Sequence, residues 1–162
     1  METGQAQATR RDLDTGGMAI FGAFASKTPS PPVGPPEDPR WSRSASGLFR
    51  RFTKLDPEAE GLSEKGGVFV IWHGGLRPQW VYAGSSPDLA KALHDMADMD
   101  EIMRFDANGG LFVSWAFIKE EFQGGVVKYL NESMVPLVEN PAVATLEDTP
   151  IAVIFPGKGV KK

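Results

Sequence analysis

The sequence predicts an α+β fold in which short strands and helices alternate between residues 61 and 156, after a long, largely irregular N-terminal arm. Three observations indicate this fold. Apolar runs rich in β-branched and aromatic residues end at glycine-containing turns, as strands do. Between these runs, apolar residues recur at helical spacing. Upstream, residues 29–39 hold six of the 13 prolines, and a length of 162 residues suits one domain plus tails.

The first two strands are expected to form a hairpin. Residues 67–73 (GVFVIWH) and 79–83 (QWVYA) are apolar, β-branched and aromatic. The intervening residues 74–78 contain two glycines and end in proline, which favours a turn over a continued strand. We therefore predict two paired strands joined by a loop at residues 74–78.

A helix is predicted to begin at Pro87, with Ser86 as its cap. Its apolar residues recur at the spacing of one helical face and extend toward Met103; they are Leu89, Ala90, Leu93, Met96 and Ala97. After a turn at Asn108-Gly109-Gly110, residues 111–119 (LFVSWAFIK) predict a third, mostly buried strand.

The C-terminal part predicts a second helix and a further strand. Gly124-Gly125 precedes a helix expected over residues 126–137, whose apolar face carries Val127, Leu130 and Met134. Residues 151–155 (IAVIF) have the composition of an additional C-terminal strand. Residues 157–162 form a basic tail.

Residues 1–39 are predicted to be a flexible arm. Proline lacks a backbone donor and favours extended polyproline II, so residues 29–39 are expected to act as a spacer. Residues 18–25 (MAIFGAFA) are apolar but far shorter than the roughly 20 residues that span a bilayer. Arg10-Arg11 followed by Ala23-Phe24-Ala25 has some features of an export signal, although acidic residues interrupt the pattern. The alternative is a short peptide that docks on another protein.

Residues 40–60 are predicted to be a basic amphipathic docking segment. Residues 40–54 (RWSRSASGLFRRFTK) contain five basic side chains and no acidic ones. In a helix, one face would carry Leu48, Phe49, Phe52 and Leu55. Such a helix docks on an acidic protein, an anionic membrane or a phosphate backbone. The alternative is a helix that packs on its own domain.

Composition excludes several classes of site. The chain has no cysteine, which excludes disulfides, thiol nucleophiles and cysteine-ligated metals. Two histidines are too few for most histidine-built metal sites, and we predict no metal site and no cofactor. Residues 61–162 carry nine basic and 13 acidic side chains. A DNA-cleaving surface normally concentrates lysine and arginine, so this balance argues against one.

Two short motifs and their order resemble the GIY-YIG nuclease superfamily. Gly67-Val68-Phe69 stands in the first predicted strand and Tyr82-Ala83-Gly84 in the second, ahead of the order helix, strand, helix. The resemblance covers about residues 66–140. It implies a small β-β-α-β-α domain, assigned here to residues 61–156 with the additional C-terminal strand.

In active members of that family, the resemblance implies a shared catalytic group: two tyrosines, an arginine on the first helix and a metal-binding glutamate on the last helix. Phosphodiester hydrolysis needs a general base, a cation to neutralise developing charge and a carboxylate to hold a metal. The matching positions here are Phe69, Tyr82, Ala92 and Val127. Because only the second tyrosine is retained, the resemblance predicts a degenerate site without catalysis.

Neighbouring polar residues are not expected to replace the missing groups. Lys91 and Glu132 lie one and five residues from the arginine and glutamate positions, about 100° and 140° around a helix. His73 and His94 have no visible carboxylate partner and predict a strand-end and a helix-surface residue. The acidic residues that follow lack the spacing of a calcium loop and predict a solvated face: Asp95, Asp98, Asp100, Glu101 and Asp106.

The sequence therefore predicts a non-catalytic interaction or structural subunit that docks onto a larger cytoplasmic protein assembly through its N-terminal arm. The alternatives are a nucleic-acid-binding protein or divergent metal-dependent nuclease, and an adaptor at an anionic membrane surface. The docking residues are expected to be aromatic, aliphatic and arginine side chains: Phe21, Phe24, Arg40, Trp41, Arg43, Leu48, Phe49, Arg50, Arg51 and Phe52.

Overall fold

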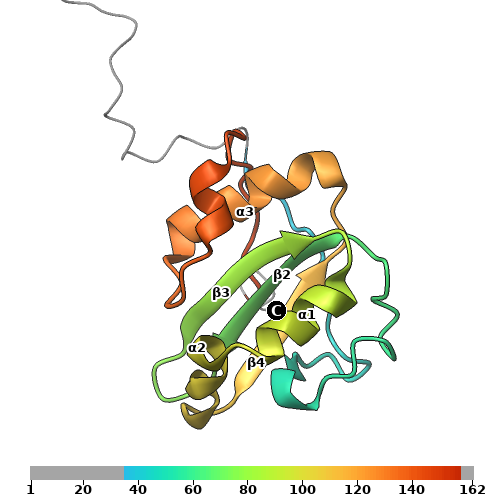
Figure 1. Ribbon diagram of the computed structural model, residues 1–162, viewed down its shortest axis with the longest axis vertical. Helices are drawn as coiled ribbons and strands as arrows, with labels where there is room; N and C mark the ends of the chain where they lie inside the picture. The colour runs from blue at the N-terminus through green and yellow to red at the C-terminus, as the bar shows by residue number, and fades with distance from the viewer. Residues whose placement is uncertain (1–34, 158–162) are drawn as a thin grey trace, which may run out of the picture. The chain divides into compact units, whose positions relative to one another are not determined.

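The computed structural model describes residues 35–157, which fold as an antiparallel four-stranded sheet with helices on both faces (Figure 1). The strand order is β1 (Arg50–Arg51), β4 (Leu111–Ala116), β2 (Gly67–His73) and β3 (Gln79–Ser86). This arrangement confirms a mixed fold of helices and strands. The apolar segment 18–25, the export-signal residues, Phe21, Phe24 and the basic tail beyond Gly157 lie outside the described residues.

Strand β2 organises the two cores because it lies between β3 and β4 and is buried along almost its whole length. Alternate side chains of a strand point to opposite faces. Phe69 and Ile71 therefore join one core with α1 (Leu89–Ala97) and α2 (Asp100–Met103). Val68 and Val70 join the other core with α3 (Glu120–Met134). The predicted hairpin of β2 and β3 is confirmed.

The first helix begins slightly later than predicted. Its cap is Asp88, whose side chain accepts a hydrogen bond from the backbone N–H of Lys91. Ser86 instead forms a local turn, in which the N–H of Asp88 donates to its hydroxyl at 3.0 Å. The helix ends at Ala97, and a separate turn of helix, α2, carries the pattern on to Met103.

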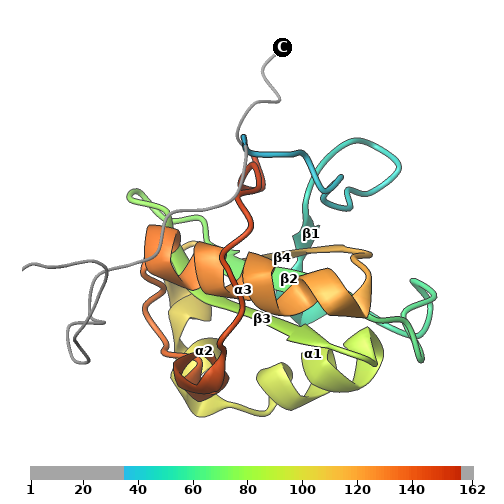
Figure 2. The same cartoon turned by 90° about the horizontal axis from the view of Figure 1, so that it is seen from above.

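The second long helix begins at Glu120, six residues before the predicted start. We expected Gly124 and Gly125 to precede this helix, but they lie inside it. A Cβ atom at Gly125 would lie 2.6 Å from the backbone oxygen of Thr149. These glycines therefore serve the close approach of the C-terminal segment, which crosses α3 (Figure 2).

The predicted C-terminal strand is wrong. Residues 151–155 make a single parallel bridge, between Val153 and Glu37, and do not join the sheet. The N–H of Ile151 donates to Gly125 in α3, and the N–H of Ile154 donates to Glu37. The segment is apolar because it packs on α3 as part of the second core. This packing buries its apolar side chains although the segment does not pair with a strand of the sheet.

The predicted amphipathic helix in residues 40–60 is also wrong. Arg50 and Arg51 form β1 opposite Val113 and Phe112 of β4, and a 3₁₀ turn, η2 (Phe52–Lys54), follows. Pairing with the open edge of β4 gives the backbone of this segment hydrogen-bond partners, whereas a short isolated helix is only marginally stable in water. The alternative that this segment packs on its own domain is the one observed. No helix within residues 35–157 is long and apolar enough to cross a membrane.

Candidate functional site

The fold brings together all four positions that the family resemblance singled out. Phe69 of β2, Tyr82 of β3, Ala92 of α1 and Val127 of α3 line one pocket of about 320 Å³. The pocket lies beside β3, where α1 and α3 approach from the two faces of the sheet. Residues up to 58 positions apart in the sequence therefore share one site.

Two aromatic rings form the floor of this pocket. The rings of Phe69 and Tyr82 stack with their centroids 5.9 Å apart and their planes 20° from parallel. Gly84 leaves room for them, because a Cβ atom there would lie 3.1 Å from the Tyr82 ring and 3.3 Å from the Phe69 ring. The motif glycine thus has a packing role that requires no catalysis.

The retained Tyr82 is suited to donating a hydrogen bond rather than to removing a proton. Only 8% of the residue is exposed, and burial raises the pKa of its hydroxyl above the ordinary value of 10.0. Because the hydroxyl stays protonated at neutral pH, it can donate a hydrogen bond but is poorly suited to accept a proton as a general base.

Three other polar side chains of the pocket, those of Asn140, Lys91 and Asp95, are already paired. Asn140 donates from Nδ2 to the oxygen of Ala83 at 3.0 Å, and its Oδ1 accepts from the N–H of Ala142 at 3.1 Å. Lys91 lines this pocket, which corrects our expectation that it points elsewhere. Its ammonium group lies 3.1 Å from the carboxylate of Asp95, the one carboxylate among the described lining residues.

Asn140→Ala is expected to lower the free energy of unfolding by about 1 kcal/mol, because it removes the cap of the 3₁₀ helix η4 (Pro141–Thr145). The loss stays modest since Asn131 also donates to the Ala83 oxygen, at 3.2 Å. Urea unfolding of the full chain measures the change. Glu139→Ala, at an exposed neighbour, is the control, and equal effects of the two variants would contradict a capping role.

Carboxylates do not converge elsewhere in the described chain. Within residues 35–157, no three histidine, aspartate or glutamate side chains are grouped closely enough to hold a metal ion. Two of the acidic residues between Asp95 and Asp106 have separate partners: Asp95 pairs with Lys91, and Asp106 accepts from the N–H of Leu111 at 2.9 Å. Glu132 does not line the pocket.

The two histidines have different surroundings. His73 is the last residue of β2, as predicted, and is 3% exposed, with Nε2 3.3 Å from Oε1 of Gln79 and no partner at Nδ1. His94 lies on the exposed surface of α1, also as predicted. Its expected lack of a carboxylate partner is wrong, because its Nε2 lies 2.9 Å from Glu58. That contact joins residues 36 positions apart, which no local pattern reveals.

The His94–Glu58 pair predicts a small dependence of stability on pH. The hydrogen bond to Glu58 raises the pKa of His94 above 6.5, with smaller contributions from the charges of Glu58, Asp56 and Asp98. A raised folded-state pKa stabilises the protein fully below the unfolded value and loses this effect as pH rises through the folded value.

Wild type should therefore exceed Glu58→Gln in stability near pH 5.5, by less than about 1 kcal/mol for such an exposed pair, and the difference should shrink toward about pH 8.5. Thermal unfolding across this range measures it, with Glu139→Gln as the control. A difference that stays constant with pH would contradict the pairing.

The predicted docking residues are divided by the structure. Phe52 is 5% exposed and belongs to the core, so it is not available as a partner anchor. Arg50 pairs with Glu60 at 3.0 Å and packs over the Trp115 ring. Trp41 donates from its indole nitrogen to Ile154 at 2.6 Å. Each of these side chains is held by contacts within the domain that no local pattern in the sequence reveals.

Other predicted docking residues remain accessible. Leu48 is 67% exposed, and Arg40 and Arg51 are also exposed. Arg43 covers the half-buried Phe49, with its guanidinium carbon 4.0 Å from the ring centroid. This loop therefore still presents an apolar tip beside arginines.

Sequence reasoning missed an aromatic pocket formed around Trp72 and Trp80. Both residues were assigned only to predicted strands, and their alternation gave no sign that they would face each other.

Comparison of the chain with family models, with curated proteins and with solved structures gave no match.

Proposed function

We propose that this chain is a non-catalytic subunit that docks onto a larger protein assembly, built on a domain similar in arrangement to the GIY-YIG nucleases. The observation that carries this proposal is the pocket of Phe69, Tyr82, Ala92 and Val127. These four side chains supply neither a metal-binding carboxylate nor a cation, and Tyr82 is held protonated. The Lys91 and Asp95 side chains that also line the pocket are paired with each other at 3.1 Å. Phosphodiester hydrolysis requires those missing groups.

The charge of the described chain supports a protein partner over nucleic acid. Residues 35–157 carry 18 acidic and 11 basic side chains. An acidic domain repels a phosphate backbone, and one of the arginines of the basic segment, Arg50, is already paired with Glu60. The exposed Leu48 loop is the described part of the proposed docking surface.

A cleavage assay tests the loss of chemistry. We expect the purified full chain, with Mg²⁺ or Mn²⁺, to cleave DNA and RNA no faster than its Tyr82→Phe variant. Metal-dependent cleavage that Tyr82→Phe abolishes would overturn the proposal, because it would assign that hydroxyl a catalytic role.

Two exposed leucines provide a matched test of docking. Leu48 is 67% exposed in the proposed docking loop, and Leu76 is fully exposed in the β2–β3 loop. Each is replaced by serine in the tagged full chain, which is purified from its own cells with and without nuclease treatment. We expect a defined set of proteins that survives nuclease and that Leu48→Ser, but not Leu76→Ser, depletes. Loss of all partners on nuclease treatment would favour the nucleic-acid alternative.

A further inference from the structure

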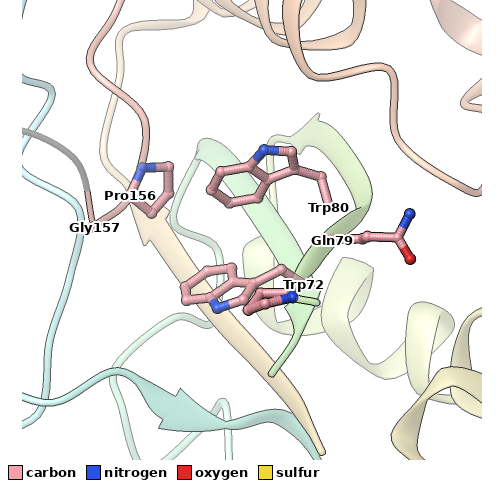
Figure 3. Close-up of a pocket in the computed structure, with 6 residues that line it drawn as sticks. Trp72, Gln79, Trp80, Pro156 and Gly157 are labelled. Carbon is pink, nitrogen blue, oxygen red and sulfur yellow. The ribbon is translucent and has the colours of Figure 1, made fainter. Parts of the chain in front are cut away.

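An aromatic pocket of about 350 Å³ opens where β2 ends and β3 begins. Its main walls are Trp72, Trp80 and Pro156, which we call the Trp corner (Figure 3). The two indole rings lie 5.7 Å apart between centroids, with their planes 69° apart. Both tryptophans are half-buried, so each ring presents a face to solvent. This site is separate from the pocket around Tyr82.

A β-bulge creates the corner. The register of β2 and β3 shifts after Ile71, which pairs with Tyr82, so that Trp72 pairs with Trp80 and Val81 is left over. The extra residue brings both indoles to the same face of the sheet, and such bulges often re-aim side chains at functional sites. Without the bulge, strict alternation would not pair them.

Three further rings hold the tryptophans in place. Phe49 meets Trp72 edge-on at 4.9 Å, Phe112 stacks on Trp72 at 6.2 Å, and Phe155 meets Trp80 at 5.8 Å. Aromatic packing of this kind fixes the rings before any ligand arrives, which reduces the entropy lost on binding.

The chemistry of the corner favours a ligand with compact apolar rings and hydrogen-bond acceptors. Among residues 35–157, no charged side chain lines the pocket. Each indole nitrogen lies on the edge facing away from the other ring (Figure 3), and neither is a buried, unpartnered atom. The side chain of Gln79 points away from the rings and contacts His73. The corner thus offers ring faces, with the indole N–H groups at its outer edges.

A proline-rich segment matches this chemistry. Proline rings are compact and apolar, and the segment offers carbonyl acceptors while its prolines lack N–H donors. Polyproline II segments dock in grooves lined by aromatic rings in this way. Nucleic bases also stack on tryptophan, but acidic side chains outnumber basic ones in residues 35–157, and none of the described residues that line the pocket is a cation for phosphates.

The chain itself contains such a segment. Residues 31–36 (PPVGPP) carry four prolines and no charge. Pro35 and Pro36 are exposed where the described chain begins. The next residue, Glu37, is bound to Ala152 and Ile154 by backbone hydrogen bonds, so the segment leaves the domain at a defined point.

We propose that the Trp corner binds residues 31–36 of a second copy of this chain. Two copies that exchange these segments form a symmetric dimer in which each contact occurs twice. This inference goes beyond the proposed function and does not depend on whether the chain docks onto another assembly.

A peptide titration tests the corner in the full-length chain. The chain has four tryptophans, so its ¹⁵N-labelled form gives four indole N–H resonances. Adding the peptide PPVGPP up to about 1 mM should shift the resonances of Trp72 and Trp80 and leave that of the buried Trp115 unchanged. The same peptide with its prolines replaced by alanine should cause no shift. These peptide controls need no folded variant.

Analytical ultracentrifugation tests the second copy. We expect a monomer–dimer equilibrium that excess PPVGPP peptide dissociates and that Trp80→Ser weakens about tenfold or more. Phe117→Ser, at an exposed aromatic residue outside the pocket, is the matched control and should leave the equilibrium unchanged. The proposal would be overturned if the chain remained monomeric up to about 1 mM, or if the indole resonances of Trp72 and Trp80 did not shift when the peptide was added. Displacement of the peptide by oligothymidine would also overturn it, because that result would indicate base stacking.

Discussion

Phe52→Ala is expected to lower the free energy of unfolding by about 3 to 5 kcal/mol, the largest effect that we predict for this chain. Phe52 is 5% exposed and packs in the core on the α1 face of the sheet. Removing its ring deletes a large apolar area and leaves a cavity that surrounding strands cannot fill by collapsing. Urea unfolding followed by circular dichroism measures the loss.

Leu48→Ala separates this core role from docking. Leu48 belongs to the same basic segment but is 67% exposed, so its truncation should change stability by no more than about 0.5 kcal/mol. If Phe52→Ala left stability unchanged and removed a partner, Phe52 would be a docking anchor after all. The pair of variants therefore tests whether the segment belongs to the domain.

Gly67→Ala is expected to lower the free energy of unfolding by about 1 to 3 kcal/mol. A Cβ atom at Gly67 would overlap the backbone oxygen of Ala116 and lie 3.1 Å from the Leu89 side chain. Ala116 belongs to β4, whose pairing with β2 begins beside this glycine. The backbone has to move, because a strand held in the middle of a sheet has no free side on which to shift.

The adjacent Gly66→Ala is the control for this prediction. A Cβ atom at Gly66 would lie 3.3 Å from Nε2 of Gln123, which is the end of a flexible side chain. Its effect on thermal unfolding should be clearly smaller than that of Gly67→Ala. Equal losses would contradict the steric argument, and a smaller loss at Gly67 would remove the structural reason for the glycine in this motif.

The strands and the first helix could be predicted because their signals are local. Residues 67–73 form β2 as expected, since β-branched and aromatic side chains suit a strand buried on both faces. The apolar stripe of α1, formed by Leu89, Ala90 and Leu93, is buried in the domain as predicted. The observed starts of α1 and α3 differ from the predicted starts by a few residues, because the cap at Asp88 and the close contact at Gly125 are not evident from local periodicity.

The predicted helix in residues 40–60 failed for a tertiary reason. The spacing of apolar residues in this segment is compatible both with a helix and with two strand residues followed by a 3₁₀ turn, and the sequence alone does not distinguish these two structures. The free edge of β4, which pairs with Arg50 and Arg51, decided the outcome. The apolar composition of residues 151–155 likewise predicts a strand, although burial against α3 explains the same composition.

The residues at the candidate site were identified by a resemblance of motifs, whereas their convergence depends on the fold. The sequence by itself determined the mixed α and β class, the central hairpin and the absence of cysteine chemistry, because these follow from composition and local periodicity. Only the tertiary structure decided which groups meet. Sheet register and helix packing bring together the Glu58–His94 pair, the Arg50–Glu60 pair, the Tyr82 pocket and the Trp corner. In the Trp corner, a single extra residue in β3 is enough to bring Trp72 against Trp80.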